Sequence, residues 1–293
     1  MYAILALLGG ALIAGMVALN GALSTHYGVY SATAIIHLAG LIFILPLCLL
    51  QKGKLFHRGV PFYLYLGGAL GVPLTICNNV AFARISVSSM LALGLFAQSV
   101  AGIAMDKYGL MGMPKRAFGA KKLFGLALTL AGIAVMTDTF DAVAVFVSLL
   151  AGVLLIVART LNARLAERTS LRAGTFFNYL VGLATALPVC LLLGRGEPAF
   201  TAFAFSPKIW MYLGGIVGAC VVLILNFTVT RVSAFSLSLF LFIGQVFAGL
   251  LIDALFLGAF TPRLLAGGLL VAAGLVANVI MERNAARREP GGG

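Results

Sequence analysis

Charged residues are scarce in this sequence. Only 10% of its 293 residues are Asp, Glu, Lys or Arg, whereas 62% are hydrophobic, and the mean hydropathy is +1.10. Soluble domains carry roughly 25% charged residues, so this composition excludes a water-soluble fold. Residues 1–51 contain no charged side chain, which is enough chain for two membrane-spanning helices of about 20 residues each. The sequence therefore predicts an all-α integral membrane protein.

Motifs for catalysis and for cofactor binding are also missing. The sequence has no HExxH, no nucleophile elbow, no phosphate-binding glycine loop and no Cys or His pair at metal-ligand spacing. Its four cysteines, Cys48, Cys77, Cys190 and Cys220, lie in apolar runs, which indicates reduced and packed thiols. The first apolar run has no basic segment before it and no cleavage site after it, so we expect it to be retained. We expect no enzymatic activity, no metal and no other cofactor.

Ten apolar segments, bounded by Gly, Pro or charged residues, predict ten transmembrane helices. The connections between them are short except for the segment 107–122. The expected spans are residues 2–23, 31–50, 61–82, 86–105, 123–138, 142–163, 173–193, 209–230, 233–257 and 264–281.

Basic residues are distributed unevenly between the two sides that these spans define. Fifteen Lys and Arg fall on the side that holds both termini and four on the other side, with Arg159 left out because it lies within a span. Since positive charge stays cytoplasmic, we expect a multi-pass protein of the inner cell membrane with cytoplasmic N- and C-termini. The net charge of +12 then reflects orientation in a lipid bilayer and does not support nucleic-acid binding. Arg159 is expected to snorkel toward the cytoplasmic boundary.

The first half of the chain recurs in the second half. Residues 10–48 match residues 152–190 at an offset of 142, with six identical residues in one register, and residues 79–106 match residues 226–253 at an offset of 147. A unit of five spans has an odd number of crossings, so its second copy must enter the bilayer upside down, and the loop charges invert accordingly. The sequence thus predicts two inverted five-helix units, residues 1–140 and 141–293, an architecture characteristic of secondary transporters.

Three segments carry a resemblance to a known family: Asn20-Gly-Ala-Leu23, AQSVAGIAMDKYGLMG at 97–112 and GQVFAGLLID at 244–253. They resemble the YdcZ-type branch of the drug/metabolite transporter (DMT) superfamily, across both halves of the chain. The resemblance implies an EamA/DMT-like transporter of ten helices. It also implies a cavity lined by the first four helices of each half, with the fifth and tenth helices at the periphery. The first span has no acid, unlike the glutamate-bearing first helix of the small multidrug-resistance relatives, so proton-for-cation exchange by that route is not implied.

Polar residues inside the spans are the candidate substrate-binding residues, because such groups are costly in a bilayer. Gln98 and Gln245 lie near the centres of the fourth and ninth spans. Inversion would place their amides at similar depth around a central cavity, where they suit a polar group that is uncharged or zwitterionic. A helix-to-helix hydrogen bond is the alternative interpretation. The other candidates, for which capping or packing competes with substrate binding, are Asn20, Asn162, His37, Asn178 and Tyr179.

Asp106 and Asp253 are the acids that repeat in both halves. They are expected either to anchor helices or to couple transport to a proton or another ion. Glycines at helical spacing on the fifth and tenth spans predict close helix packing. That packing occurs either within the monomer or along the seam of a homodimer.

The leading hypothesis is a secondary transporter that moves a small metabolite or drug-like solute across the membrane by alternating access. A flippase for lipids or lipid-linked compounds is an alternative, and it predicts an opening between helices toward the bilayer. A non-transporting membrane assembly partner is a further alternative, in which the two glutamines would affect stability and not flux.

Overall fold

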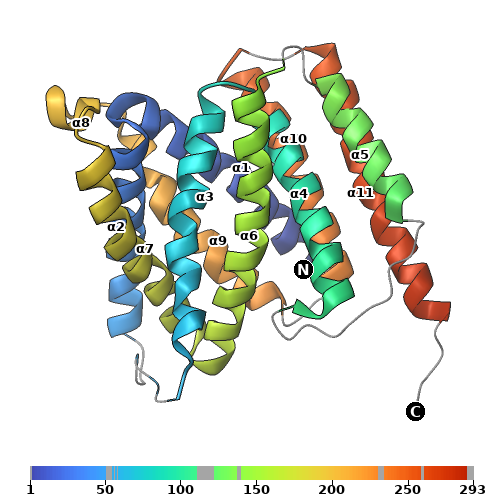
Figure 1. Ribbon diagram of the computed structural model, residues 1–293, viewed down its shortest axis with the longest axis horizontal. Helices are drawn as coiled ribbons and strands as arrows, with labels where there is room; N and C mark the ends of the chain where they lie inside the picture. The colour runs from blue at the N-terminus through green and yellow to red at the C-terminus, as the bar shows by residue number, and fades with distance from the viewer. Residues whose placement is uncertain are drawn as a thin grey trace.

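The computed structural model describes residues 2–50, 55, 57, 59–110, 122–136, 140–229, 234–258 and 261–288. Its regular secondary structure over these residues is helical throughout (Figure 1). The helices are α1 (Tyr2–Tyr27), α2 (Val29–Leu49), η1 (Phe62–Tyr65), α3 (Leu66–Phe82), α4 (Val87–Tyr108), α5 (Lys122–Met136), α6 (Ala142–Arg168), α7 (Leu171–Leu193), α8 (Pro198–Thr201), η3 (Ile209–Leu213), α9 (Gly214–Val229), α10 (Ala234–Leu255) and α11 (Pro262–Arg288).

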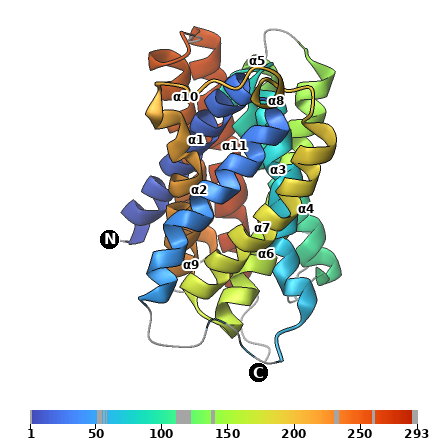
Figure 2. The same ribbon diagram turned by 90° about the vertical axis from the view of Figure 1, so that its left-hand side faces the viewer.

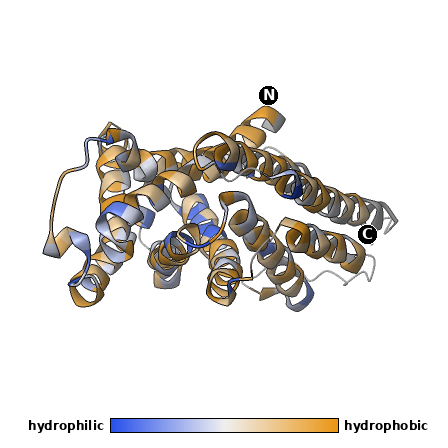
Figure 3. Ribbon diagram, turned by 90° about the horizontal axis from the view of Figure 1, so that it is seen from above, coloured by the Kyte–Doolittle hydropathy of each residue, from blue (hydrophilic) through white to orange (hydrophobic). Residues whose placement is uncertain are grey.

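The fold is an all-α membrane fold, as the composition predicts. Six helical segments are long and apolar enough to cross a bilayer, namely α1, α2, η1 with α3, α4, α6 and α7. Shorter apolar helices lie in α5, in η3 with α9, in α10 and in α11. Each of the ten expected spans overlaps one of these segments, although α6 continues to Arg168, five residues past its expected end. Most of the helical ribbon carries the colour of hydrophobic residues (Figure 3).

Helices from the two halves of the chain pack against one another. α1 packs against α9 and α10, while α6 packs against α3 and α4, and α2 packs against α7. α1 and α6 run in opposite directions through the bundle (Figures 1 and 2). α5 and α11 lie side by side at one edge of the bundle, as the family resemblance implies (Figure 1).

Glycines allow equivalent helix pairs to approach closely. A methyl group at Gly10 of α1 would lie 2.2 Å from the carbonyl oxygen of Leu241 in α10, and one at Gly152 of α6 would lie 2.2 Å from that of Gly94 in α4. These two contacts are related by the offsets of 142 and 147. Two further pairs of contacts recur in the same way, Gly68 to Asn178 with Gly215 to Ile36, and Gly40 to Tyr179 with Gly182 to His37.

The glycine stripes on α5 and α11 pack against each other. A methyl group at Gly132 would lie 2.7 Å from the carbonyl oxygen of Gly267, and one at Gly274 would lie 2.6 Å from that of Gly125. Small residues at such a crossing let two helix backbones meet. These glycine faces therefore pack within one chain. They do not form the homodimer seam that the sequence allowed as the alternative. Homodimerisation itself stays a prediction.

Two carboxylates from the second half cap helices of the first half. The fully buried Asp253 of α10 accepts hydrogen bonds of 2.8 Å from the backbone N–H groups of Val87 and Ser88, and another from the Ser88 hydroxyl. Glu197 accepts from the N–H groups of Tyr30 and Ser31, also at 2.8 Å. The first N–H groups of a helix lack intrahelical partners and favour negative charge. The two carboxylates thus fasten the N-terminal ends of α4 and α2.

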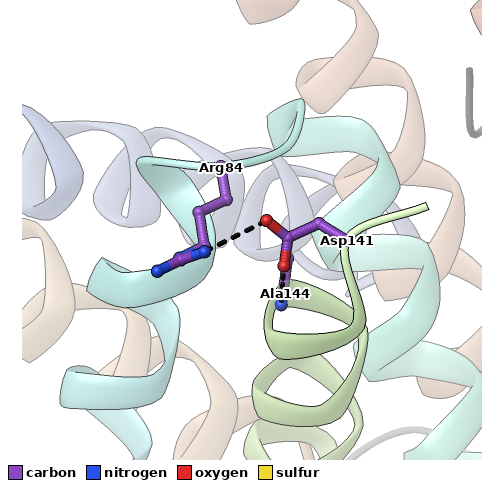
Figure 4. A network of polar contacts seen from close by, with 3 residues as sticks. All are labelled: Arg84, Asp141 and Ala144. Carbon is purple, nitrogen blue, oxygen red and sulfur yellow. Dashed lines mark hydrogen bonds and ion pairs between the residues drawn. The ribbon is translucent and has the colours of Figure 1, made fainter. Parts of the chain in front are cut away.

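A third carboxylate lies at the start of α6 (Figure 4). Asp141 accepts a hydrogen bond of 2.8 Å from the Ala144 N–H and an ion-pair contact of 3.1 Å from Arg84. The backbone hydrogen bond first, and then Arg84, hold the pKa of Asp141 below its ordinary value. This contact ties the turn before α4 to the start of α6.

Candidate functional site

A cavity of about 180 Å³ lies inside the bundle. Its lining comes from α1, α2, α3, α4, α6, α7, α9 and α10, with no described residue of α5 or α11. These are the helices that the family resemblance assigns to a central cavity.

The cavity collects all seven residues that the sequence proposes for substrate binding. They are Asn20, His37, Gln98, Asn162, Asn178, Tyr179 and Gln245. Of the two proposed coupling residues, the structure places the side chain of Asp253. Asp253 is not among the lining residues and caps α4 instead. Asp106 belongs to α4, but its side chain lies outside the described residues, and its coupling role stays a prediction.

The lining is arranged in pairs that obey the sequence repeat. Most lining residues have a partner at an offset of 142 or 147 that also lines the cavity. The cavity therefore lies where equivalent faces of the two predicted units meet. The pairs are Ile13 and Leu155, Met16 and Ala158, Val17 and Arg159, Asn20 and Asn162, Ile36 and Asn178, His37 and Tyr179, Gly67 and Gly214, Gly71 and Gly218, Leu74 and Val221, Thr75 and Val222, Asn78 and Leu225, and Gln98 and Gln245.

His37 and Tyr179 form a matched pair at the crossing of α2 and α7. Nδ1 of His37 lies 2.8 Å from the carbonyl oxygen of Thr33. In the neutral ring this nitrogen carries the proton, which leaves Nε2 as an acceptor. The imidazole occupies the space above Gly182, and the Tyr179 ring occupies the space above Gly40. Each ring therefore helps to pack the crossing as well as lining the cavity.

Asn20 and Asn162 line the cavity and approach glycines on facing helices. A methyl group at Gly214 would lie 1.9 Å from Oδ1 of Asn20, and one at Gly67 would lie 2.3 Å from Oδ1 of Asn162. Both oxygens are buried without a hydrogen-bond partner. The Asn162 side-chain N–H donates to Oδ1 of Asn178 at 2.8 Å. Both asparagines thus contact a facing helix, which is the packing interpretation raised by the sequence.

Gln98 uses one donor within its own helix. Its Nε2 lies 3.3 Å from the carbonyl oxygen of Gly94, one turn earlier in α4. Gln245 is 2% exposed and lines the same cavity. The hydrogen bond of Gln98 is therefore not a helix-to-helix contact, and the substrate role of the two glutamines stays a prediction.

The sequence interpretation of Arg159 was wrong. Arg159 lines the cavity, and its Nη2 is buried without a hydrogen-bond partner. A guanidinium buried in the lining of the cavity does not extend to the cytoplasmic boundary, as the expected snorkelling requires. Its offset partner Val17 and its i, i+3 spacing to Asn162 were the signals in the sequence that it belongs to the cavity face. Thr75 and Asn78 of α3 were also missed, and they line the same cavity.

Comparison with known proteins gives a family and a fold for the chain. The family model described as "Putative inner membrane exporter, YdcZ" matches residues 1–135 and residues 143–279. A comparison with curated proteins found no match. Among solved structures, the chain is similar to one described as "Crystal structure of protein", with 15% identity, a TM-score of 0.65 and 97% of each chain covered. At this identity the similarity shows the fold alone.

Proposed function

This chain belongs to the YdcZ family of inner membrane exporters in the DMT superfamily, and from that premise we propose that it moves a small metabolite or drug-like solute by alternating access. The observation that carries the proposal is the central cavity, whose lining comes in equivalent pairs from the two halves of the chain. In inverted-repeat transporters the two halves rock around a fixed site near the bilayer midplane. A lining drawn from both halves supports such a site, because substrate sites of these transporters lie at the interface of the two repeats.

The two proposed units are residues 1–140 and 141–293, inverted relative to each other. Three observations support this division. The family model matches one segment in each unit, close glycine contacts recur at the sequence offsets, and α1 and α6 run in opposite directions (Figures 1 and 2).

The conformation described is proposed to be closed on the side where α8 lies. Glu197 and Asp253 of the second unit bind the starts of α2 and α4 in the first unit on that side. Tyr27 and Tyr212 also share a hydrogen bond there. A rocking motion must break contacts of this kind because they join the two units. The distribution of basic residues assigns this side to the exterior.

Coupling to protons is proposed to act through helix contacts. Asp253 touches α4 and does not line the cavity, so protonation would weaken the cap on α4 without changing a substrate contact. Asp106 at the matching sequence position is the second proposed coupling group.

Transport can be tested with the purified chain in proteoliposomes. We expect counterflow of at least one solute from a broad metabolite panel, and we expect Gln98→Ala and Gln245→Ala to reduce it without lowering the melting midpoint. Leu38→Ala is the control, because Leu38 follows His37 in α2 but is 45% exposed on the outside of the bundle. The absence of solute flux in the wild type would contradict the proposal, and movement of labelled lipid instead would indicate a flippase. Glutamine variants that lose stability at unchanged flux would indicate a packed assembly protein.

A further inference from the structure

The two walls of the cavity differ in polarity at equivalent positions. Four of its equivalent pairs combine a polar residue with an aliphatic one. All four polar members lie on α3, α6 and α7, which pack against one another, and all four aliphatic members lie on α1, α2 and α9, which also pack together. The polar members are Thr75, Asn78, Arg159 and Asn178, and the aliphatic members are Val222, Leu225, Val17 and Ile36.

Arg159 gives the polar wall a positive charge that nothing in the described lining balances. It is the one Lys, Arg, Asp or Glu among the described lining residues, and no ion pair to it occurs in the part of the chain that the structure describes. Its Nη2 has no hydrogen-bond partner. A guanidinium inside a membrane protein is unfavourable without an anion, so an anionic group on a ligand would stabilise it. Arginine is well suited to this role because its planar fork matches a carboxylate.

The size and the opposite wall of the cavity restrict the rest of the ligand. A cavity of 150 Å³ holds a benzene molecule, so about 180 Å³ accommodates a compound of roughly seven to eight non-hydrogen atoms. Val17, Val222 and Leu225 present aliphatic surface to its body. The described lining supplies no carboxylate for an ammonium group, which favours a monoanion over the uncharged or zwitterionic group expected from the glutamines.

We propose that this cavity binds a small aliphatic carboxylate, with its charged group on Arg159 and its apolar body against α1 and α9. The proposal names the substrate class of the site and rests on the proposed transport function. It predicts that the substrate binds in one orientation. The two halves have equivalent backbones around the cavity, but only one wall carries Arg159 to bind the carboxylate.

Binding is tested with four probes at pH 7.5 on the purified full-length protein in an uncharged detergent. The probes are 4-methylpentanoate, 4-methylpentanamide, 4-methylpentylamine and acetate, and the readout is the melting midpoint as a function of probe concentration. We expect 4-methylpentanoate to bind ten- to a hundredfold more tightly than the amide, which is the range for a hydrogen bond to a charged group. We expect the amine and acetate to bind more weakly still, because one carries the wrong charge and the other lacks the aliphatic body.

Two variants separate the charge from the apolar wall. Arg159→Gln should remove the preference for the carboxylate over the amide. Val17→Gln, at the equivalent position on the opposite wall, should weaken both probes and keep the preference. Equal binding of carboxylate and amide by the wild type, or no response to any probe, overturns the proposal, and this comparison needs no variant to fold. An Arg159→Gln variant that is folded and still prefers the carboxylate also overturns it.

Flux measurements distinguish a failure of the proposed carboxylate site from a failure of the proposed transport function. Carboxylate binding that depends on Arg159, without flux of the bound compound in proteoliposomes, would uphold the site and contradict transport. Flux of uncharged solutes that is the same in wild type and Arg159→Gln, together with absent carboxylate preference, would uphold transport and overturn the assignment of the substrate class.

Discussion

Individual glycines set how closely the helices around the cavity approach. At Gly152 a methyl group would lie 2.2 Å from the Gly94 carbonyl oxygen and 2.8 Å from the Ala97 Cβ, whereas at Gly15 no atom lies within 4 Å. Both glycines are helical, so alanine is favoured at either by helix propensity alone. The difference between the two sites therefore isolates the effect of packing.

We predict that Gly152→Ala lowers the free energy of unfolding by about 1–3 kcal/mol, the cost of forcing an extra methyl group into a packed interface. Gly15→Ala should be neutral or slightly stabilising. The measurement is the unfolding midpoint of each variant in detergent with increasing denaturant. Equal effects of the two substitutions would show that α4 and α6 are not held at the distance described.

The start of α6 depends on Asp141, which both caps the helix and pairs with Arg84. Since the pKa of Asp141 is lowered in the folded protein, its contribution to stability is complete above the ordinary Asp pKa of about 3.9. The contribution disappears as the pH falls through the lower folded value. We predict that Asp141→Ala lowers the melting midpoint at pH 7 and that its difference from the wild type shrinks as the pH falls below the ordinary Asp pKa of about 3.9. Asp141→Asn, which retains a capping side chain, should lie between them, and a difference that does not change with pH would contradict the role of the charge.

At the scale of helices, periodic and repeated features were predictable, and contacts between distant segments were not. The spans follow from hydropathy, and the offset of 147 residues pairs Gln98 with Gln245, which both line the cavity. The cavity position of Arg159 was missed because Arg159 was placed by its distance from the end of the span, although it lies three residues before Asn162 on the face of α6 that lines the cavity. Glu197 was not singled out because its partner is a helix start 166 residues away, which no local pattern reveals.

The distribution of basic residues predicts the orientation of the whole molecule in the membrane, and cysteine labelling can test it. We predict that Arg195→Cys and Phe140→Cys react with a membrane-impermeant thiol reagent from outside the cell, while Lys107→Cys and Glu167→Cys react only after permeabilisation. All four side chains are exposed or adjoin helix ends, on opposite sides of the bundle. The background protein carries Cys220→Ala, because the other three native cysteines are buried. Reaction of Arg195→Cys and Glu167→Cys from the same side would exclude this arrangement of α7 relative to α6.

Alternating access makes a prediction about Glu197, because its hydrogen bonds to Tyr30 and Ser31 join the two proposed units on the closed side. Glu197→Gln weakens a charged helix cap by about 1 kcal/mol, which shifts an equilibrium roughly fivefold. A cysteine at Val222 in the cavity, in the Cys220→Ala background, should then react several-fold faster with an impermeant reagent applied from outside. Glu167→Gln is the matched control, since Glu167 is exposed near the other end of the bundle and its change should leave the rate unaltered. If the two variants label at the same rate, Glu197 stabilises α2 without closing the exterior, and the outer closure must lie in the contacts of Asp253 or Tyr27.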